Sequence, residues 1–140
     1  KVMIFKLKPE IKQLWTTALR SGDYKQGRGA LRNDNNEMCC LGVLCELHRR
    51  ATGDELAELW ESDCVYGDES YTPPLSVHEW ALTSSPDASY PIGGLQFRER
   101  VTEDPSDRTD AGLRRSLLLS EANDNGSTFN EIANAIDKYL

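Results

Sequence analysis

The residues best suited to bind a ligand lie between Gly22 and Leu47, where a glycine-rich basic loop directly precedes an apolar run that contains cysteines. The loop has the sequence KQGRG. Glycines let backbone N–H groups approach an anion closely, and the cations neutralise it. Arg28 and Arg32 could clamp a phosphate with paired donors. The pattern predicts an anion site composed of Tyr24, Lys25, Gln26, Gly27, Arg28, Gly29 and Arg32.

The same loop also fits a glycine-bearing turn whose Lys and Arg side chains point to solvent. It is not a P-loop, because the pattern GxxxxGK[ST] is absent and a lone GxG has little specificity. Trp15 and Tyr24 are aromatic side chains that could stack on a base. Trp15 lies on an apolar helical stripe, which favours a place in the core.

The cysteines and histidines fit neither a metal site nor a nucleophile well. Adjacent cysteines rarely bridge each other, and no two CxxC or HxxxH pairs indicate zinc. Cys45 and His48 would share a helix face, but an apolar run disfavours the thiolate. The motifs HExxH and GxSxG and a dinucleotide fingerprint are absent. We therefore expect no catalytic residue, no bound metal, no cofactor and no enzymatic activity.

Charge is distributed unevenly along the 140 residues. Residues 1–32 carry eight basic and two acidic side chains, a net charge of +6, whereas the remaining residues carry eight basic and 21 acidic ones, a net charge of −13. A basic N-terminal face on an acidic body would attract a compact anion and repel nucleic acid and anionic membranes. Alternatively, the Lys and Arg side chains simply solvate one helix and one hairpin.

The chain contains no apolar run of about 18 residues, the length that a membrane span needs. The first residues, KVMIFKLK, lack the apolar stretch and cleavage site of a signal peptide. We expect a protein of the cytoplasm that has no membrane partner.

Periodicity and turn residues predict an α+β fold in which helices pack on a small antiparallel sheet or hairpin. The whole chain, residues 1–140, has the size of one domain. Residues 84–115 are rich in Pro, Gly, Ser, Asp and Arg, and we expect them to be irregular apart from a strand at 95–101. The other expected elements are an extended segment at 2–7, a hairpin of 29–32 with 37–40, and helices from Pro9 to Gly22, from Cys40 to Gly53, at 54–62, at 76–82, at 120–126 and from Phe129 to the C-terminus.

Two helix starts have the spacing of a capping box, in which a Ser or Thr and a Glu three residues later satisfy each other's backbone N–H groups. These pairs are Ser76 with Glu79 and Thr128 with Glu131. The final helix should close the core, because its apolar residues recur at helical spacing.

Three groups of residues together resemble a widespread group of small, mostly uncharacterised proteins of bacteriophages and prophages. They are ALRSGDYKQGRGAL from Ala18 to Leu31, CCLGVLC from Cys39 to Cys45, and NDNGSTFNEIA from Asn123 to Ala133. The resemblance covers about the first 50 and the last 25 residues. It implies a phage-encoded accessory protein that acts inside an infected bacterium, where host take-over or counter-defence are plausible roles.

The leading hypothesis is a non-catalytic protein, expected to be a homodimer, that sequesters a small anionic nucleotide-type ligand. A second hypothesis is a protein–protein inhibitor whose acidic body docks on a basic host protein. A third is an enzyme that degrades a signalling nucleotide.

Overall fold

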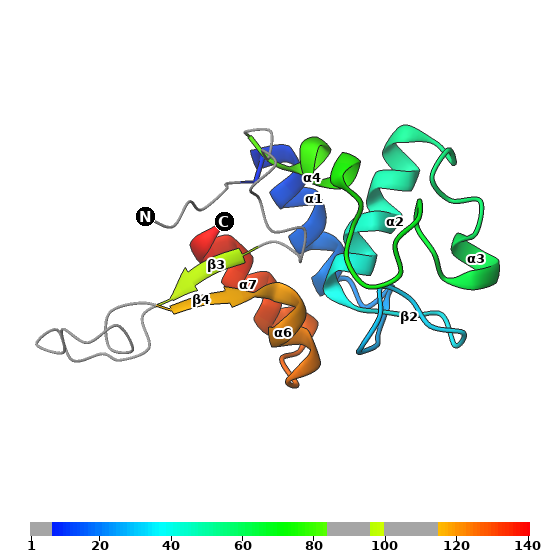
Figure 1. Ribbon diagram of the computed structural model, residues 1–140. Helices are drawn as coiled ribbons and strands as arrows, with labels where there is room; N and C mark the ends of the chain where they lie inside the picture. The colour runs from blue at the N-terminus through cyan, green and yellow to red at the C-terminus, as the bar shows by residue number, and fades with distance from the viewer. Residues whose placement is uncertain (1–6, 84–95, 100–114) are drawn as a thin grey trace, which may run out of the picture.

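The computed structural model describes residues 7–83, 96–99 and 115–140 (Figure 1). The fold class is α+β, as predicted: helices are combined with two small two-stranded sheets. Along the chain the elements are α1 (Pro9–Arg20), β1 (Lys25–Gln26), β2 (Glu37–Met38), α2 (Cys40–Thr52), α3 (Trp60–Asp63), α4 (Leu75–Ala81), β3 (Gln96–Glu99), β4 (Arg115–Leu118), α6 (Leu119–Asp124) and α7 (Phe129–Tyr139).

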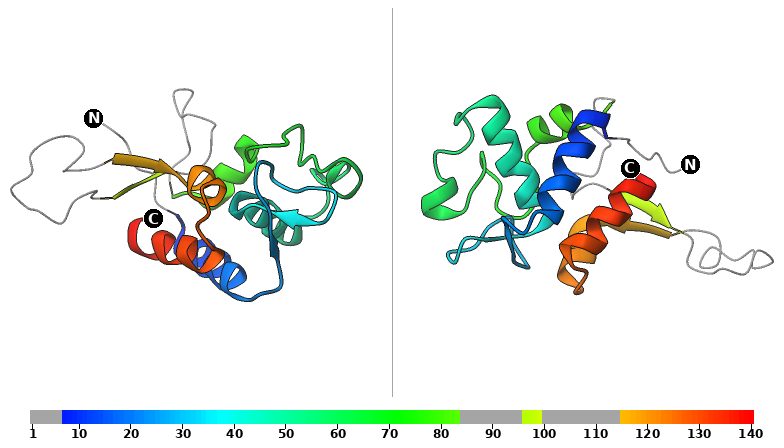
Figure 2. Two further views of the ribbon diagram at one scale, coloured as in Figure 1. Left: turned by 90° about the horizontal axis from the view of Figure 1, so that it is seen from below. Right: turned by 180° about the vertical axis from the view of Figure 1, so that it is seen from behind.

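The first and last helices pack side by side (Figure 2). Apolar residues of α1 recur at helical spacing, and Ile11, Trp15 and Leu19 are buried. Helix α7 contributes Ile132 and Ile136 to the same core. Burying each such side chain stabilises the fold by roughly 1.5–3 kcal/mol. The predicted capping box at Thr128 and Glu131 is confirmed, so α7 begins where its own sequence directs.

Helix α2 passes through the core, and every residue from Cys40 to His48 is buried. Helix α1 contacts the first turn of α2, where Trp15 Nε1 donates a hydrogen bond to the Cys40 carbonyl oxygen at 3.0 Å. On the other side the chain near Leu31 crosses α2 at Gly42. A Cβ atom on Gly42 would lie 1.8 Å from the Leu31 carbonyl oxygen. Glycine is therefore required there by backbone contact.

The predicted hairpin is only partly correct, because strands β1 and β2 pair in parallel. Arg32 does form an antiparallel bridge with Met38, close to the predicted register. The chain reverses direction twice between β1 and β2, once near Gly29 (φ +83°) and again near Asn36 (φ +59°). Two reversals restore the original direction, which is why β1 and β2 are parallel.

Two further predictions need correction. Residues 54–62 do not form one helix: 54–59 form turns, and α3 begins only at Trp60. Trp60 is buried in the core and Leu56 packs against it, whereas Leu59, the third residue of the expected apolar stripe, is exposed. Helix α4 begins at Leu75 after Pro74, one residue before the predicted start, and has no side-chain cap.

The expected strand at 95–101 is confirmed in its central part, because β3 pairs antiparallel with β4. The helical turn before Gly126 is confirmed as α6. The extended segment at 2–7 lies outside the described residues except for Leu7, which bridges Leu82. Most of the region 84–115 also lies outside them. None of the helices in the described ranges has the length and apolar composition needed to cross a membrane.

Substituting Gly42→Ala should destabilise the protein by about 3 kcal/mol or more, because the backbone at Leu31 would have to move. Alanine in a helix is normally favoured over glycine by about 1 kcal/mol, so the expected sign is reversed. Urea unfolding would measure the change. Ala51→Gly, at an exposed position of the same helix, is the control and should cost only about 1 kcal/mol. A Gly42→Ala protein as stable as wild type would contradict the close crossing.

Candidate functional site

The glycine-rich loop lies against the segment that follows β4, and the side chain of Asn123 joins the two. This carboxamide is fully buried. Its Nδ2 donates to the Gly27 carbonyl oxygen at 2.8 Å, and its Oδ1 accepts from Gln26 Nε2 at 2.8 Å. The same oxygen accepts from the backbone N–H of Cys40 at 3.2 Å, at the N-terminus of α2. We call this set of contacts the Asn123 junction.

The rest of the loop is held by the same segment. Arg28 Nε donates to the Asn123 carbonyl oxygen at 3.2 Å, and the Gly29 N–H donates to Asp124 Oδ1 at 2.9 Å. Gly27 passes so close to β2 that a Cβ atom would lie 2.8 Å from the Glu37 Cβ. Gln26, Gly27, Arg28 and Gly29 thus have structural roles in the junction, and they do not line the pocket that contains Tyr24 and Arg32.

The three other residues of the predicted site, Tyr24, Lys25 and Arg32, do come together in a pocket of about 440 Å³ between β1, α2 and α3. The structure adds Glu46, Arg49 and Arg50 from α2. We call it the arginine pocket. Its walls consist of Asp23, Tyr24, Lys25, Arg32, Asn35, Asn36, Met38, Glu46, Arg49, Arg50, Trp60 and Glu61.

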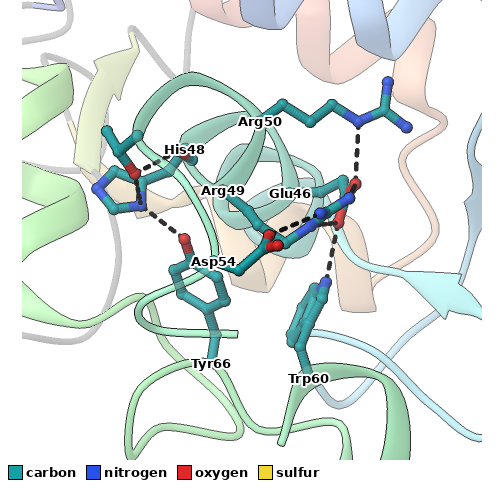
Figure 3. Close-up of polar contacts among 8 residues, drawn as sticks. Glu46, His48, Arg49, Arg50, Asp54, Trp60 and Tyr66 are labelled. Atoms are coloured by element: carbon teal, nitrogen blue, oxygen red, sulfur yellow. Dashed lines mark hydrogen bonds and ion pairs between the residues drawn. The ribbon is translucent and has the colours of Figure 1, made fainter. Parts of the chain in front are cut away.

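Glu46 organises the arginine pocket (Figure 3). Its side chain is only 7% exposed and accepts hydrogen bonds from Arg49, from Arg50 Nε at 2.9 Å and from Trp60 Nε1 at 3.0 Å. Burial alone would raise the pKa of Glu46, but these donors together lower it below its usual value. Arg49 also pairs with Asp54 at 3.0 Å. The carboxylate is thus charged and holds two guanidinium groups in place.

Arg32 fixes the opposite wall. It donates to the carbonyl oxygens of Trp60 at 2.8 Å and Glu61 at 3.1 Å, and to Asn36 Oδ1 at 3.0 Å. Its guanidinium carbon lies 6.0 Å from the centre of the Trp60 ring. Arg32 therefore connects the loop to α3 and contributes a positive charge to the pocket.

Arg50 and Lys25 are the more accessible cations, with side chains 61% and 72% exposed. Lys25 Nζ lies 3.2 Å from Glu37 Oε2. The guanidinium carbon of Arg50 lies 5.7 Å from the centre of the Tyr24 ring. Within the described residues, the two terminal nitrogens of Arg50 donate no hydrogen bond, since only its Nε is used by Glu46. The pocket can thus offer paired N–H donors beside an aromatic ring.

Sequence reasoning missed Glu46, Arg49, Arg50 and Trp60. A signal was present, because Glu46 precedes Arg49 and Arg50 by three and four residues, the spacing of ion pairs on a helix. Cations in the last turn of a helix also interact favourably with the helix dipole, so Arg49 and Arg50 by themselves indicate only the end of a helix.

Burial decides the chemistry of the cysteines. It raises the pKa of the Cys39, Cys40 and Cys45 thiols, which favours the unreactive protonated form. Cys45 and His48 both lie on α2, as the sequence predicted. In the ranges that the structure describes, no three His, Cys, Asp or Glu side chains are arranged to hold a metal ion.

Comparison with known proteins assigns a family but no activity. A family model described as a domain of unknown function, DUF8296, matches residues 7–140. The chain belongs to this family. No curated protein and no solved structure matches it. The DUF8296 match spans the loop, the CCLGVLC run and the C-terminal segment, which are the parts joined by Asn123.

Substituting Asn123→Ala should lower the free energy of unfolding by about 2–4 kcal/mol, because it leaves buried partners at Gly27 and Cys40 without hydrogen bonds. Thermal and urea unfolding would measure the loss. Asn125→Ala, at an exposed position two residues later, should change stability by less than about 0.5 kcal/mol. Equal effects of the two substitutions would argue against the junction.

The lowered pKa of Glu46 predicts how stability depends on pH. Its contribution should be complete above the usual carboxyl value of 4.5 and lost as the pH falls through the lower folded value. Glu46→Gln should destabilise the protein by about 3 kcal/mol at pH 7, and by less in acid. Urea unfolding between pH 3 and pH 7 would test this, with the exposed Glu79→Gln as control. A Glu46→Gln curve parallel to wild type would count against the charged network.

Proposed function

We propose that this protein binds and sequesters a small anionic, nucleotide-type ligand in the arginine pocket without altering it. The observation that carries the proposal is the arrangement around Glu46. A buried carboxylate binds Arg50 through Nε, and the terminal nitrogens of that guanidinium have no partner within the described residues. The Tyr24 ring lies beside the same group.

The arrangement suits a phosphate next to a planar base. A guanidinium held through Nε presents its terminal N–H groups as a fork that matches two phosphate oxygens. An aromatic ring adds stacking that tolerates different bases, typically about 1–3 kcal/mol per base. Because Glu46 already orders both arginines, less conformational entropy is lost on binding.

The ligand-binding residues in this proposal differ from those expected from the sequence. Tyr24, Lys25 and Arg32 are kept, and Arg49 and Arg50 replace the loop residues of the Asn123 junction. The resemblance to phage proteins supports a counter-defence role in the bacterial cytoplasm, where sequestration would need a Kd below about 1 μM, or −8 kcal/mol. A homodimer remains part of the proposal because closed dimers are the commonest assemblies.

Native mass spectrometry of the protein purified from phage-infected bacteria should reveal a bound nucleotide-like mass, released intact on denaturation. Titration calorimetry with AMP, GMP, cyclic di-AMP and ADP-ribose would then define the class. Arg50→Gln should lower the affinity for the bound nucleotide about 10- to 100-fold, because the charge-assisted hydrogen bonds between the guanidinium and the phosphate are lost. Arg20→Gln removes the same charge from an exposed pair with Asp137 and should leave affinity unchanged.

Three outcomes would reject this proposal. Protein that is empty from infected cells and binds none of the four probes would favour a protein partner for the acidic body. Recovery of a cleaved nucleotide after incubation would favour the degrading enzyme. Equal losses of affinity in the two arginine variants would show that net charge, and not the arginine pocket, attracts the ligand.

A further inference from the structure

A second hollow lies on the other side of α2 from Glu46. It has a volume of about 270 Å³, shares no residue with the arginine pocket, and is lined by His48, Thr52, Glu55, Leu56 and Ser76. Figure 3 shows the His48 ring and the Glu46–Arg50 group pointing away from opposite sides of the helix. Positions two apart on a helix differ by about 200° in direction, which explains the separation.

His48 is the chemically distinctive group of this hollow. It is only 7% exposed, and its Nδ1 lies 2.6 Å from the Tyr66 hydroxyl. Its ring also meets Trp80 edge to face at 5.2 Å. The Nε2 atom forms no hydrogen bond with any described residue and points away from Tyr66 (Figure 3). A nine-tenths buried histidine thus has one nitrogen without a partner among the described residues, and this histidine lines the hollow.

The hydrogen bond to Tyr66 decides what this nitrogen offers. Burial raises the pKa of Tyr66 and lowers the pKa of His48, so the phenol keeps its proton and the imidazole is neutral. Within the described residues, the Tyr66 hydroxyl has Nδ1 as its hydrogen-bond partner at 2.6 Å. Thr52 Oγ1 lies farther from Nδ1, at 3.4 Å, and donates to the His48 carbonyl oxygen at 2.7 Å. The phenol therefore donates to Nδ1, and the ring proton is on Nε2. His48, which lines the hollow, therefore has an N–H donor at Nε2.

We propose that this hollow is a second binding site, which takes a neutral carboxamide-type group. The carbonyl oxygen of the ligand accepts from His48 Nε2, the amide N–H of the ligand donates to the Glu55 carboxylate, and the apolar part of the ligand contacts Leu56. A carboxylate ligand is disfavoured because Glu55 carries the same charge. An amine would satisfy Glu55 but leave the His48 donor without an acceptor. The site needs no nucleotide in the arginine pocket, so it stands or fails separately from the proposed function.

Nitrogen-15 NMR of the histidine rings tests the site in the intact protein. The chain has two histidines, and the fully buried His78 does not line the hollow, so its signals serve as an internal reference. Benzamide should shift the His48 Nε2 signal saturably, with a dissociation constant on the order of 1 mM. Benzoate and benzylamine should bind at least tenfold more weakly.

Variants at the rim and behind the ring separate the two expected hydrogen bonds. Glu55→Ala, at an exposed position, should weaken benzamide about tenfold and leave acetophenone, which has the carbonyl but no N–H, unchanged. Tyr66→Phe should lower the share of His48 with its proton on Nε2 and weaken both probes. Tyr71→Phe removes a hydroxyl from a tyrosine that is 69% exposed and should change nothing.

The proposal would be overturned by any of three results: benzamide leaves the His48 signals unmoved, benzoate binds as well as benzamide, or the free protein has its ring proton on Nδ1. A benzamide shift that persists unchanged in Glu55→Ala would likewise reject the two-point contact.

Discussion

The buried carboxamide of Asn123 connects the basic loop and the start of α2 to a segment that lies 83 to 97 residues farther along the chain. Its two polar atoms bind Gln26, Gly27 and the first residue of α2, and its own backbone carbonyl accepts from Arg28. A carboxamide can donate and accept at once, which neither a carboxylate nor an aliphatic side chain of this size can do. A buried donor or acceptor that loses its hydrogen bond destabilises the fold by more than the bond contributes to stability when it is formed. The loop, α2 and the C-terminal segment therefore share one structural requirement.

Helix α2, which begins at the Asn123 junction, contributes residues to both candidate sites. Its apolar run from Cys40 to Leu47 packs in the core, so the helix cannot rotate without exposing those residues. Glu46 and His48, which are nearly as buried, are thereby directed to opposite sides. Each meets an aromatic residue from the segment after α2, Trp60 for Glu46 and Tyr66 for His48. The fixed rotation of α2 therefore places Glu46 and His48 at two separate hollows.

Under the proposed function, the ion pairs around Glu46 serve more to preorganise the arginine pocket than to stabilise the fold. The free energy needed to remove a carboxylate and two guanidinium groups from water offsets much of their electrostatic attraction. Replacing such a buried ion-pair group with apolar residues therefore often stabilises a protein. In this network Glu46 holds the Arg50 guanidinium, whose carbon lies 5.7 Å from the centre of the Tyr24 ring. The same reasoning applies to Arg32, whose Nη1 donates to two backbone carbonyl oxygens while the side chain still lines the pocket.

Local signals in the sequence determined where α1, α2, α6 and α7 lie. Apolar periodicity, glycines that end helices and the Thr128 capping box all act within a few residues of the chain. They also identified Trp15 as a core residue and grouped Tyr24, Lys25 and Arg32. The parallel pairing of β1 with β2, the short α3 and the division of the basic loop between a junction and a pocket were decided by tertiary structure. Each depends on partners distant along the chain: Asn123 lies 97 residues beyond Gln26. No periodicity encodes such a contact, because it joins residues of different elements that become neighbours only in the folded structure.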